Sequence, residues 1–270
     1  MPAARSDIAV LAVVCLATWG AVPVLAQSAD SLEVGRKMLA EDNPGELWVL
    51  RGERLFHEKR GPKSASLEQC DFGMGPGRLA GAFARLPRYF SDSGKVEDME
   101  SRLLKCLVEL QGLDRGAIIQ ARFSNLDRAS DMEALSTFVA SRSNGMKMDV
   151  RLEHPQEREM YKAGEYIFYR RTGPTDFACT SCHGDEGKRI RLQDLPNMTD
   201  RKQMQAVIAG WPAYRGTHST VRTMQHRLYD CNWQMRLPDL GFASDVSIAL
   251  TTYLNYRGNG AVIQVPGVRR

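Results

Sequence analysis

The feature that most constrains this chain is the segment Cys179-Thr-Ser-Cys182-His183, within FACTSCHGDEG at residues 177–187. In C-x-x-C-H, two thiols bond the vinyl groups of a haem and the adjacent histidine ligates its iron. A redox dithiol would require a βαβ context, and a zinc site would require a second pair of ligands. Neither is present in the sequence, so the motif predicts one covalently bound haem c with His183 as the proximal iron ligand.

The first residues indicate where this haem is attached. Arg5 is followed by an apolar run and by small residues before Gln27, which is the order of a secretory signal. Gly20 and Pro23 interrupt the run before it reaches the length of a spanning helix. We expect a cleaved signal peptide at residues 1–26 rather than an uncleaved anchor, a periplasmic location, and no membrane span in the mature protein.

The charge of the chain argues against nucleic acid as a partner. Lys and Arg number 36 and Asp and Glu number 32, which gives a formal net charge of +4. These charges are scattered along the chain, whereas nucleic-acid binding usually requires a dense basic face. We therefore predict no nucleic-acid binding.

The sequence also contains a duplication. The stretch GERLFHEKRGPKSASLEQCD at residues 52–71 aligns with GEYIFYRRTGPTDFACTSCH at residues 164–183, 112 positions later. Two further blocks match in the same order at shifts of 125 and 115 positions: residues 102–106 with 227–231, and residues 135–145 with 250–260. Three blocks in the same order predict two similar domains.

The duplication predicts a mainly all-α fold with two tandem cytochrome c-like domains, at residues 27–150 and 151–270. In each domain we expect a first helix, a Gly-Pro turn before the cysteine site, and an amphipathic closing helix that ends at Asn-Gly with a left-handed cap. Leu67 and Asp71 stand where the second copy has Cys179 and His183. The first domain is therefore predicted to hold no haem.

The mature chain contains cysteines at positions 70, 106, 179, 182 and 231. Cys70 and Cys106 are the only pair in the haemless domain, and an oxidising compartment favours a disulfide between them over two free thiols. Their equivalents in the second copy are Cys182 and Cys231, which should then lie at one haem pocket.

Cys231 is therefore the predicted distal ligand of the haem iron. An inert buried thiol is one alternative interpretation, and ligation by another side chain is a second. The rival ligands are His218, Met224, His226 and Met235.

Arg227 precedes Cys231 by four residues, which is about one helical turn. Its guanidinium could stabilise a thiolate or bind an oxyanion through its planar fork. Arg102 occupies the matching position in the haemless copy, which favours a framework contact instead. The residues alone leave both interpretations open.

Four stretches resemble the SoxA family, the haem subunits of the SoxAX cytochromes of bacterial thiosulfate oxidation. They are RGPKSASLEQCDFGMGPG, ARLPRYF, ACTSCHG and HRLYDCNWQMR, and the resemblance covers nearly the whole mature chain. The family includes members with two haems, from which this chain departs at Leu67 and Asp71. The chain thus resembles the single-haem type with a disulfide in place of the first haem.

The resemblance implies an L-cysteine S-thiosulfotransferase that oxidatively joins thiosulfate to a cysteine of SoxY in the SoxYZ carrier, with electrons passing through haem to SoxX. It also implies that Cys231 is the distal ligand, often a persulfide, and that Arg227 lies beside it at the active site. The haem motif on its own is equally typical of a non-catalytic periplasmic electron-transfer cytochrome.

Overall fold

The structure is a computed structural model that describes residues 38, 41–190 and 193–269. The expected signal peptide at residues 1–26 lies outside the described residues. The first half contains α2 (Glu46–His57), η1 (Phe83–Arg85), β1 (Arg88–Phe90), β2 (Lys95–Glu97), α3 (Met99–Glu109), α4 (Arg115–Gln120) and α5 (Asp131–Ser141). The second half contains α6 (Pro155–Tyr169), α7 (Cys179–His183), β3 (Arg189–Ile190), β4 (Gln193–Asp194), α8 (Arg201–Ile208), β5 (Ala213–Arg215), η2 (Gly216–His218), β6 (Thr220–Arg222), α9 (Met224–Met235), α10 (Asp245–Arg257) and β7 (Gly267–Arg269).

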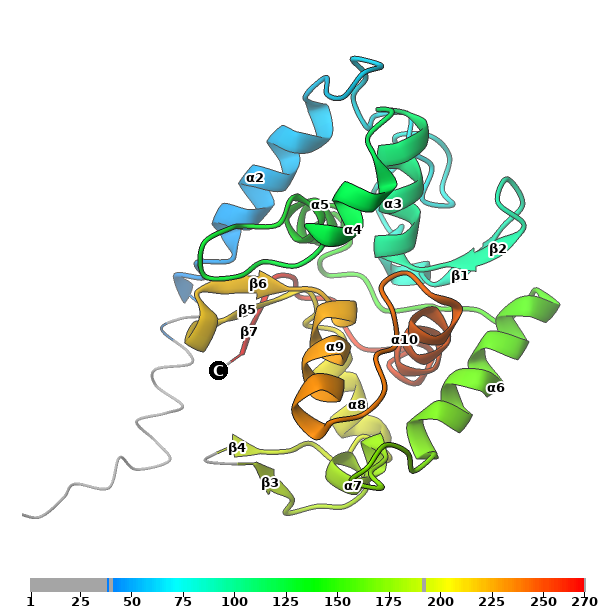
Figure 1. Cartoon of the computed structure of the whole chain (residues 1–270), viewed down its shortest axis with the longest axis vertical. Coiled ribbons are helices and arrows are strands. Elements are labelled where there is room, and N and C mark those ends of the chain that lie inside the picture. The colour runs from blue at the N-terminus through cyan, green and yellow to red at the C-terminus, as the bar shows by residue number, and fades with distance from the viewer. Residues whose placement is uncertain (1–37, 39–40, 191–192, 270) are drawn as a thin grey trace, which may run out of the picture.

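The two halves repeat one arrangement, as the duplication predicts. In each, a long first helix packs on a closing helix, α2 on α5 and α6 on α10, and a short hairpin leads directly into a helix. The hairpin registers also match, since Arg88 pairs with Glu97 in one copy and Ala213 with Arg222 in the other, 125 positions later. Figure 1 shows the first half, in blue to green, above the second half, which runs from light green to red. The expected mainly helical fold is confirmed.

Each pair of long helices crosses at a glycine. A Cβ atom added to Gly52 would lie 2.1 Å from the carbonyl oxygen of Ala134, and one added to Gly164 would lie 2.0 Å from that of Ala249. No side chain fits at such distances, so only glycine allows the two backbones to approach this closely. The same contact in both copies shows that the duplication preserves helix packing as well as sequence.

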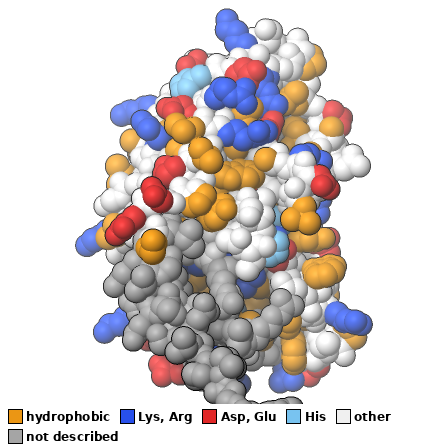
Figure 2. All heavy atoms as spheres, turned by 90° about the vertical axis from the view of Figure 1, so that its left-hand side faces the viewer, with side chains coloured by type: hydrophobic (Ala, Val, Ile, Leu, Met, Phe, Trp, Pro, Cys, Tyr) orange, Lys and Arg blue, Asp and Glu red, His pale blue; other side chains and the backbone are white. Residues whose placement is uncertain are grey.

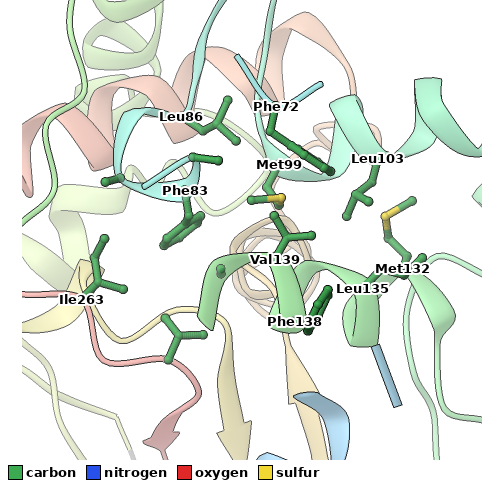
Figure 3. Close-up of a cluster of buried hydrophobic side chains, with 14 of the residues drawn as sticks. Phe72, Phe83, Leu86, Met99, Leu103, Met132, Leu135, Phe138, Val139 and Ile263 are labelled. Atoms are coloured by element: carbon green, nitrogen blue, oxygen red, sulfur yellow. The ribbon is translucent and has the colours of Figure 1, made fainter. Parts of the chain in front are cut away.

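Buried hydrophobic side chains fill the core of the first half. Figure 3 shows Phe72 and Leu103 above α5 and Phe138 on the lower side of this helix, where its ring packs against Phe56. Leu67, at the position that matches Cys179, is completely buried. Hydrophobic burial and close packing thus stabilise a half that lacks the haem ligands.

The closing helices end earlier than expected. We predicted that they would end at Asn-Gly, but α5 ends at Ser141 and α10 at Arg257. Gly145 and Gly260 do have positive φ angles, of +80° and +90°, yet both lie beyond the helix caps. The local sequence pattern identified the left-handed turn but misplaced it, because the preceding asparagines bind a distant segment rather than cap their own helices.

These asparagines hold the two tails, the segments at residues 145–150 and 260–265 that follow the closing helices. Asn144 accepts a hydrogen bond from Val265 N (2.8 Å) and donates one to its carbonyl oxygen (2.7 Å). Asn259 makes the same two bonds to Val150, each of 2.8 Å. The tails also pair with each other, Met148 N donating to Ala261 O and Ile263 N to Met146 O. Each half therefore binds the tail of the other.

The described surface is of mixed character. Figure 2 shows the left-hand side of Figure 1, where basic and acidic side chains lie among hydrophobic ones. On α2 the side chains of Leu47 and Leu50 are exposed by 69% and 61%. In the part of the chain that the structure describes, no helix combines the length and apolar character needed to cross a bilayer.

Two carboxyl groups are buried where the halves meet. Asp98 Oδ2 accepts a hydrogen bond from Gln225 Nε2 (2.6 Å), and Glu100 Oε1 accepts one from Gln225 N (3.2 Å). Burial raises the pKa of both carboxyls, and the adjacent Asp98 raises that of Glu100 further, to about 8. Glu100 therefore stays protonated in the folded protein at neutral pH.

This protonation makes stability depend on pH. The pKa of Glu100 rises from its ordinary value of 4.5 to about 8 on folding, so the folded state holds a proton that the unfolded state releases. The free energy of unfolding should fall as pH rises from 4.5 to about 8. We expect Glu100→Gln, which keeps the carbonyl acceptor, to reduce this fall and to stabilise the protein by roughly 2 kcal/mol at alkaline pH.

Urea unfolding of both proteins at acidic and alkaline pH measures the effect. Glu159→Gln, on the exposed side of α6, is the matched control and should behave as the wild type. An equally steep pH dependence in wild type and Glu100→Gln would contradict the assignment.

Candidate functional site

The short helix α7 brings the three residues of the haem motif together. Ser181 Oγ accepts a hydrogen bond from Ala178 N (3.0 Å) at the start of the helix, so Cys179 and Cys182 lie about one turn apart. Both are free, half-buried thiols. Burial and, to a smaller extent, the nearby Cys231 raise the pKa of Cys179 to about 12. Within the described ranges no group of three or more His, Cys, Asp or Glu side chains is arranged to hold a bare metal ion.

His183 is oriented by the backbone. Its Nδ1 donates a hydrogen bond to the carbonyl oxygen of Pro196 (2.9 Å), which leaves Nε2 free to ligate iron. Burial lowers the pKa of His183, so the neutral imidazole that a metal requires is favoured. Two adjacent free thiols and an imidazole held in this tautomer fit haem c.

Helix α9 supplies the opposite side of the site. Thr223 caps it by accepting a hydrogen bond from His226 N (3.3 Å), and Arg227 and Cys231 lie one turn apart on the same face. Both are half-buried. Cys231 influences the pKa of Cys179, and Arg227 lowers that of His183, so the face of α9 that carries them lies near α7.

The rival distal ligands differ in how far they are engaged elsewhere. His226 Nδ1 binds Glu133 (2.5 Å), and its ring stacks on Phe123 at 4.2 Å. Met224 lines a cavity between the two halves. His218 follows β5 and contacts the hydroxyl of Thr217 (2.9 Å), and Met235 is the last residue of α9.

The cysteines of the first half form a closed pair. Cys70 and Cys106 are joined by a disulfide, with an S–S distance of 1.98 Å and a Cα–Cα distance of 5.7 Å. Their equivalents, Cys182 and Cys231, are free thiols. The two equivalent positions thus form a disulfide in the first half and carry two free thiols in the second.

One further residue of this region was missed in the sequence. Arg215, at the end of β5, interacts electrostatically with Arg227 and Cys231 and therefore lies in the same region of the half. Burial and the neighbouring guanidinium of Arg227 lower its pKa to about 10. The signal that could have identified Arg215 is its alignment with Phe90 of the first hairpin, 125 positions earlier.

A helical domain with C-x-x-C-H on a short helix, a backbone-held histidine and a facing thiol defines a c-type cytochrome. A family model described as "SoxA/TsdA, cytochrome c domain" matches residues 51–148 and 163–263, one match in each half. The chain therefore belongs to the SoxA family, and its cytochrome c domain implies haem c.

Relatives and a solved structure agree with this assignment. The L-cysteine S-thiosulfotransferase subunit SoxA of Hydrogenophilus thermoluteolus is 42% identical over 98% of this chain and 100% of its own length. The protein of the same name from Paracoccus pantotrophus is 31% identical over 84% of this chain and 72% of its own. The crystal structure of SoxXA from P. pantotrophus superposes with a TM-score of 0.72 at 27% identity, covering 88% of this chain and 84% of that one.

Proposed function

We propose that this chain is the haem c subunit of an L-cysteine S-thiosulfotransferase that joins thiosulfate to a cysteine of SoxY in the SoxYZ carrier. The observation that carries the proposal is the free, half-buried thiol of Cys231, which lies near Cys179 and one turn from Arg227. The equivalent thiol in the first half is closed in a disulfide. The names of the relatives and the fold shared with SoxXA support the same activity.

Each residue of the site has a role in this reaction. Cys179 and Cys182 would hold one haem c, His183 and Cys231 would be its proximal and distal ligands, and Cys231 would also carry the sulfur chemistry. Arg227 stabilises the thiolate of Cys231 or the sulfur oxyanion beside it. Haem c bound here supplies one-electron transfer to the partner cytochrome SoxX.

The balance of the reaction explains why a redox partner is needed. Joining the carrier thiol to thiosulfate forms one S–S bond and releases the thiol proton and two electrons. A haem would accept these electrons one at a time, so an external electron acceptor is required, and the partner cytochrome SoxX would supply it. A heterodimer with SoxX meets this need, and the SoxXA complex of P. pantotrophus supports it.

The division of the chain follows from the same assignment. We assign residues 1–26 to a signal peptide, 27–150 to a haemless cytochrome c-like domain and 151–270 to the haem-binding domain, in a periplasmic protein of the single-haem type. Leu67 and Asp71 in place of a thiol and an imidazole support a haemless first domain. Buried hydrophobic side chains around α5 supply its core.

Intact-mass analysis of the carrier after incubation with thiosulfate, SoxX and the holo protein tests the proposal. We expect a thiosulfate adduct on the carrier cysteine with the wild type, and a loss of at least about 100-fold in its rate with Cys231→Ala. The covalent haem content of both proteins is the control for folding. A Cys231→Ala protein that retains its haem and the full rate would leave the alternative function, a non-catalytic electron carrier.

A further inference from the structure

The first half contains an internal reference for the surroundings of Arg227. Its equivalent, Arg102, is almost fully buried and neutralised, since Nη1 donates to Asp92 Oδ1 and Glu97 Oε2 at 3.0 Å each. The guanidinium of Arg102 also lies 4.0 Å from the ring centroid of Phe90. In the haemless copy this arginine is therefore a framework residue.

The second half replaces all of these partners. Because the two hairpins share one register, the positions of Phe90, Asp92 and Glu97 correspond to Arg215, Thr217 and Arg222. Two carboxylates and an aromatic ring around Arg102 thus become two guanidiniums and a hydroxyl around Arg227. These three positions carry two negative charges in the first half and two positive charges in the second, one of which, Arg222, is paired with Asp230.

The strand pairing fixes where these arginines point. Arg215 pairs with Thr220 of β6 and with Arg269 of β7, and Ala213 of the same strand pairs with Arg222. Paired residues project to the same side of a sheet, as do residues two apart on a strand. Arg215 and Arg222 therefore leave one face, and the ion pair of Arg222 with Asp230 shows that this face packs on α9.

Two of the guanidiniums near Arg215 have partners already. Arg222 binds Asp230, and Arg269 donates to the carbonyl oxygen of Val207 (3.2 Å). Among the described residues, Arg215 and Arg227 have no ion pair, and Nε of Arg215 is buried without a hydrogen-bond partner. Two unpaired like charges in a half-buried place destabilise the fold unless an anion is bound between them.

We propose that Arg215 and Arg227 together bind the sulfonate group of thiosulfate beside Cys231. Arg215 supplies the second guanidinium group that donates hydrogen bonds to this anion. This inference rests on the proposed function, which supplies the anion. Two planar forks match the three oxygens of a sulfonate, and holding these oxygens leaves the terminal sulfur free to face the thiol of Cys231. A carboxylate of the haem itself has the same chemistry, so the experiment must separate the two anions.

Calorimetric titration of thiosulfate into the oxidised holo protein, without carrier, measures the site directly. Arg215→Phe installs the residue that the haemless copy has at this position, and we expect it to weaken the affinity by at least about tenfold. Arg215→Lys, which keeps the charge but not the fork, should lie between Arg215→Phe and wild type. The control is Arg54→Gln, an exposed arginine of α2, which should bind as the wild type does.

Covalent haem content and reduction potential are measured on the same samples. Weaker thiosulfate binding with both haem properties unchanged is the expected result. An unchanged affinity for thiosulfate in Arg215→Phe and Arg215→Lys would overturn the proposal. If the affinity is retained while the haem content or the reduction potential changes, the proposal is also overturned, because Arg215 then binds the haem carboxylate. Arg215-dependent binding in a wild type that forms no carrier adduct would refute the proposed function alone.

Discussion

Gly164→Ala is expected to prevent the haem half from folding. The new Cβ would lie 2.0 Å from the carbonyl oxygen of Ala249 and 2.8 Å from Cβ of Tyr253, so α6 and α10 would have to separate. Both are rigid atoms near the backbone, and no rotamer change relieves the contact. We expect a loss of more than about 3 kcal/mol in the free energy of unfolding, seen as a lowered urea midpoint or as insoluble protein.

The chain offers matched comparisons for this prediction. Gly52→Ala places its Cβ 2.1 Å from the carbonyl oxygen of Ala134 and should be as damaging. Gly116→Ala lies in the short helix α4, where the nearest atom is Oδ2 of Asp114 at 3.1 Å, and alanine favours a helix. Gly116→Ala should leave the midpoint unchanged or raise it. A Gly164→Ala protein as stable as Gly116→Ala would refute the close-packing argument.

Removal of the Cys70–Cys106 disulfide is expected to cost about 4 kcal/mol, because the bond closes a loop between residues separated by 36 positions. The double variant Cys70→Ala, Cys106→Ala removes it without leaving buried polar groups. Urea unfolding with and without a reductant measures the loss. Reductant should lower the midpoint of the wild type to that of the variant and leave the variant unchanged, whereas a wild type insensitive to reductant would contradict the prediction.

The parts of the fold that depend on local sequence were predictable. Helices at 131–141 and 245–257 were expected, but their predicted amphipathic character was wrong, since residues 132–140 and 247–255 are buried on every side. The haem motif is a contiguous pattern whose chemistry depends little on the rest of the fold. The strands were not predictable, because three-residue strands such as β1 and β5 are too short to show an alternation. Asn144 and Asn259 were misread for a related reason, since their partners lie more than 100 residues away.

The candidate site shows the same division. Cys179, Cys182 and His183 are adjacent in sequence, and Cys231 could be inferred by counting cysteines across the two copies. Arg215 was missed, because its alignment with Phe90 has no meaning until the structure shows that Phe90 and two carboxylates surround Arg102. The two hairpins align in the sequence, but only the structure shows that the residues around Arg102 in the first hairpin differ in charge from those at the same positions in the second.

The exchange of tails gives the duplication the geometry of a closed dimer. Asn144 and Asn259 use the same atoms on equivalent residues of each other's tails, so the contact is isologous and is satisfied by two copies. Both tail contacts are made within the pair, so no tail is left to bind a third copy. In an open array of repeats, by contrast, each unit has a free edge that binds the next unit. The first half therefore contributes to the fold of the second through these tail contacts, whether or not it binds a cofactor of its own.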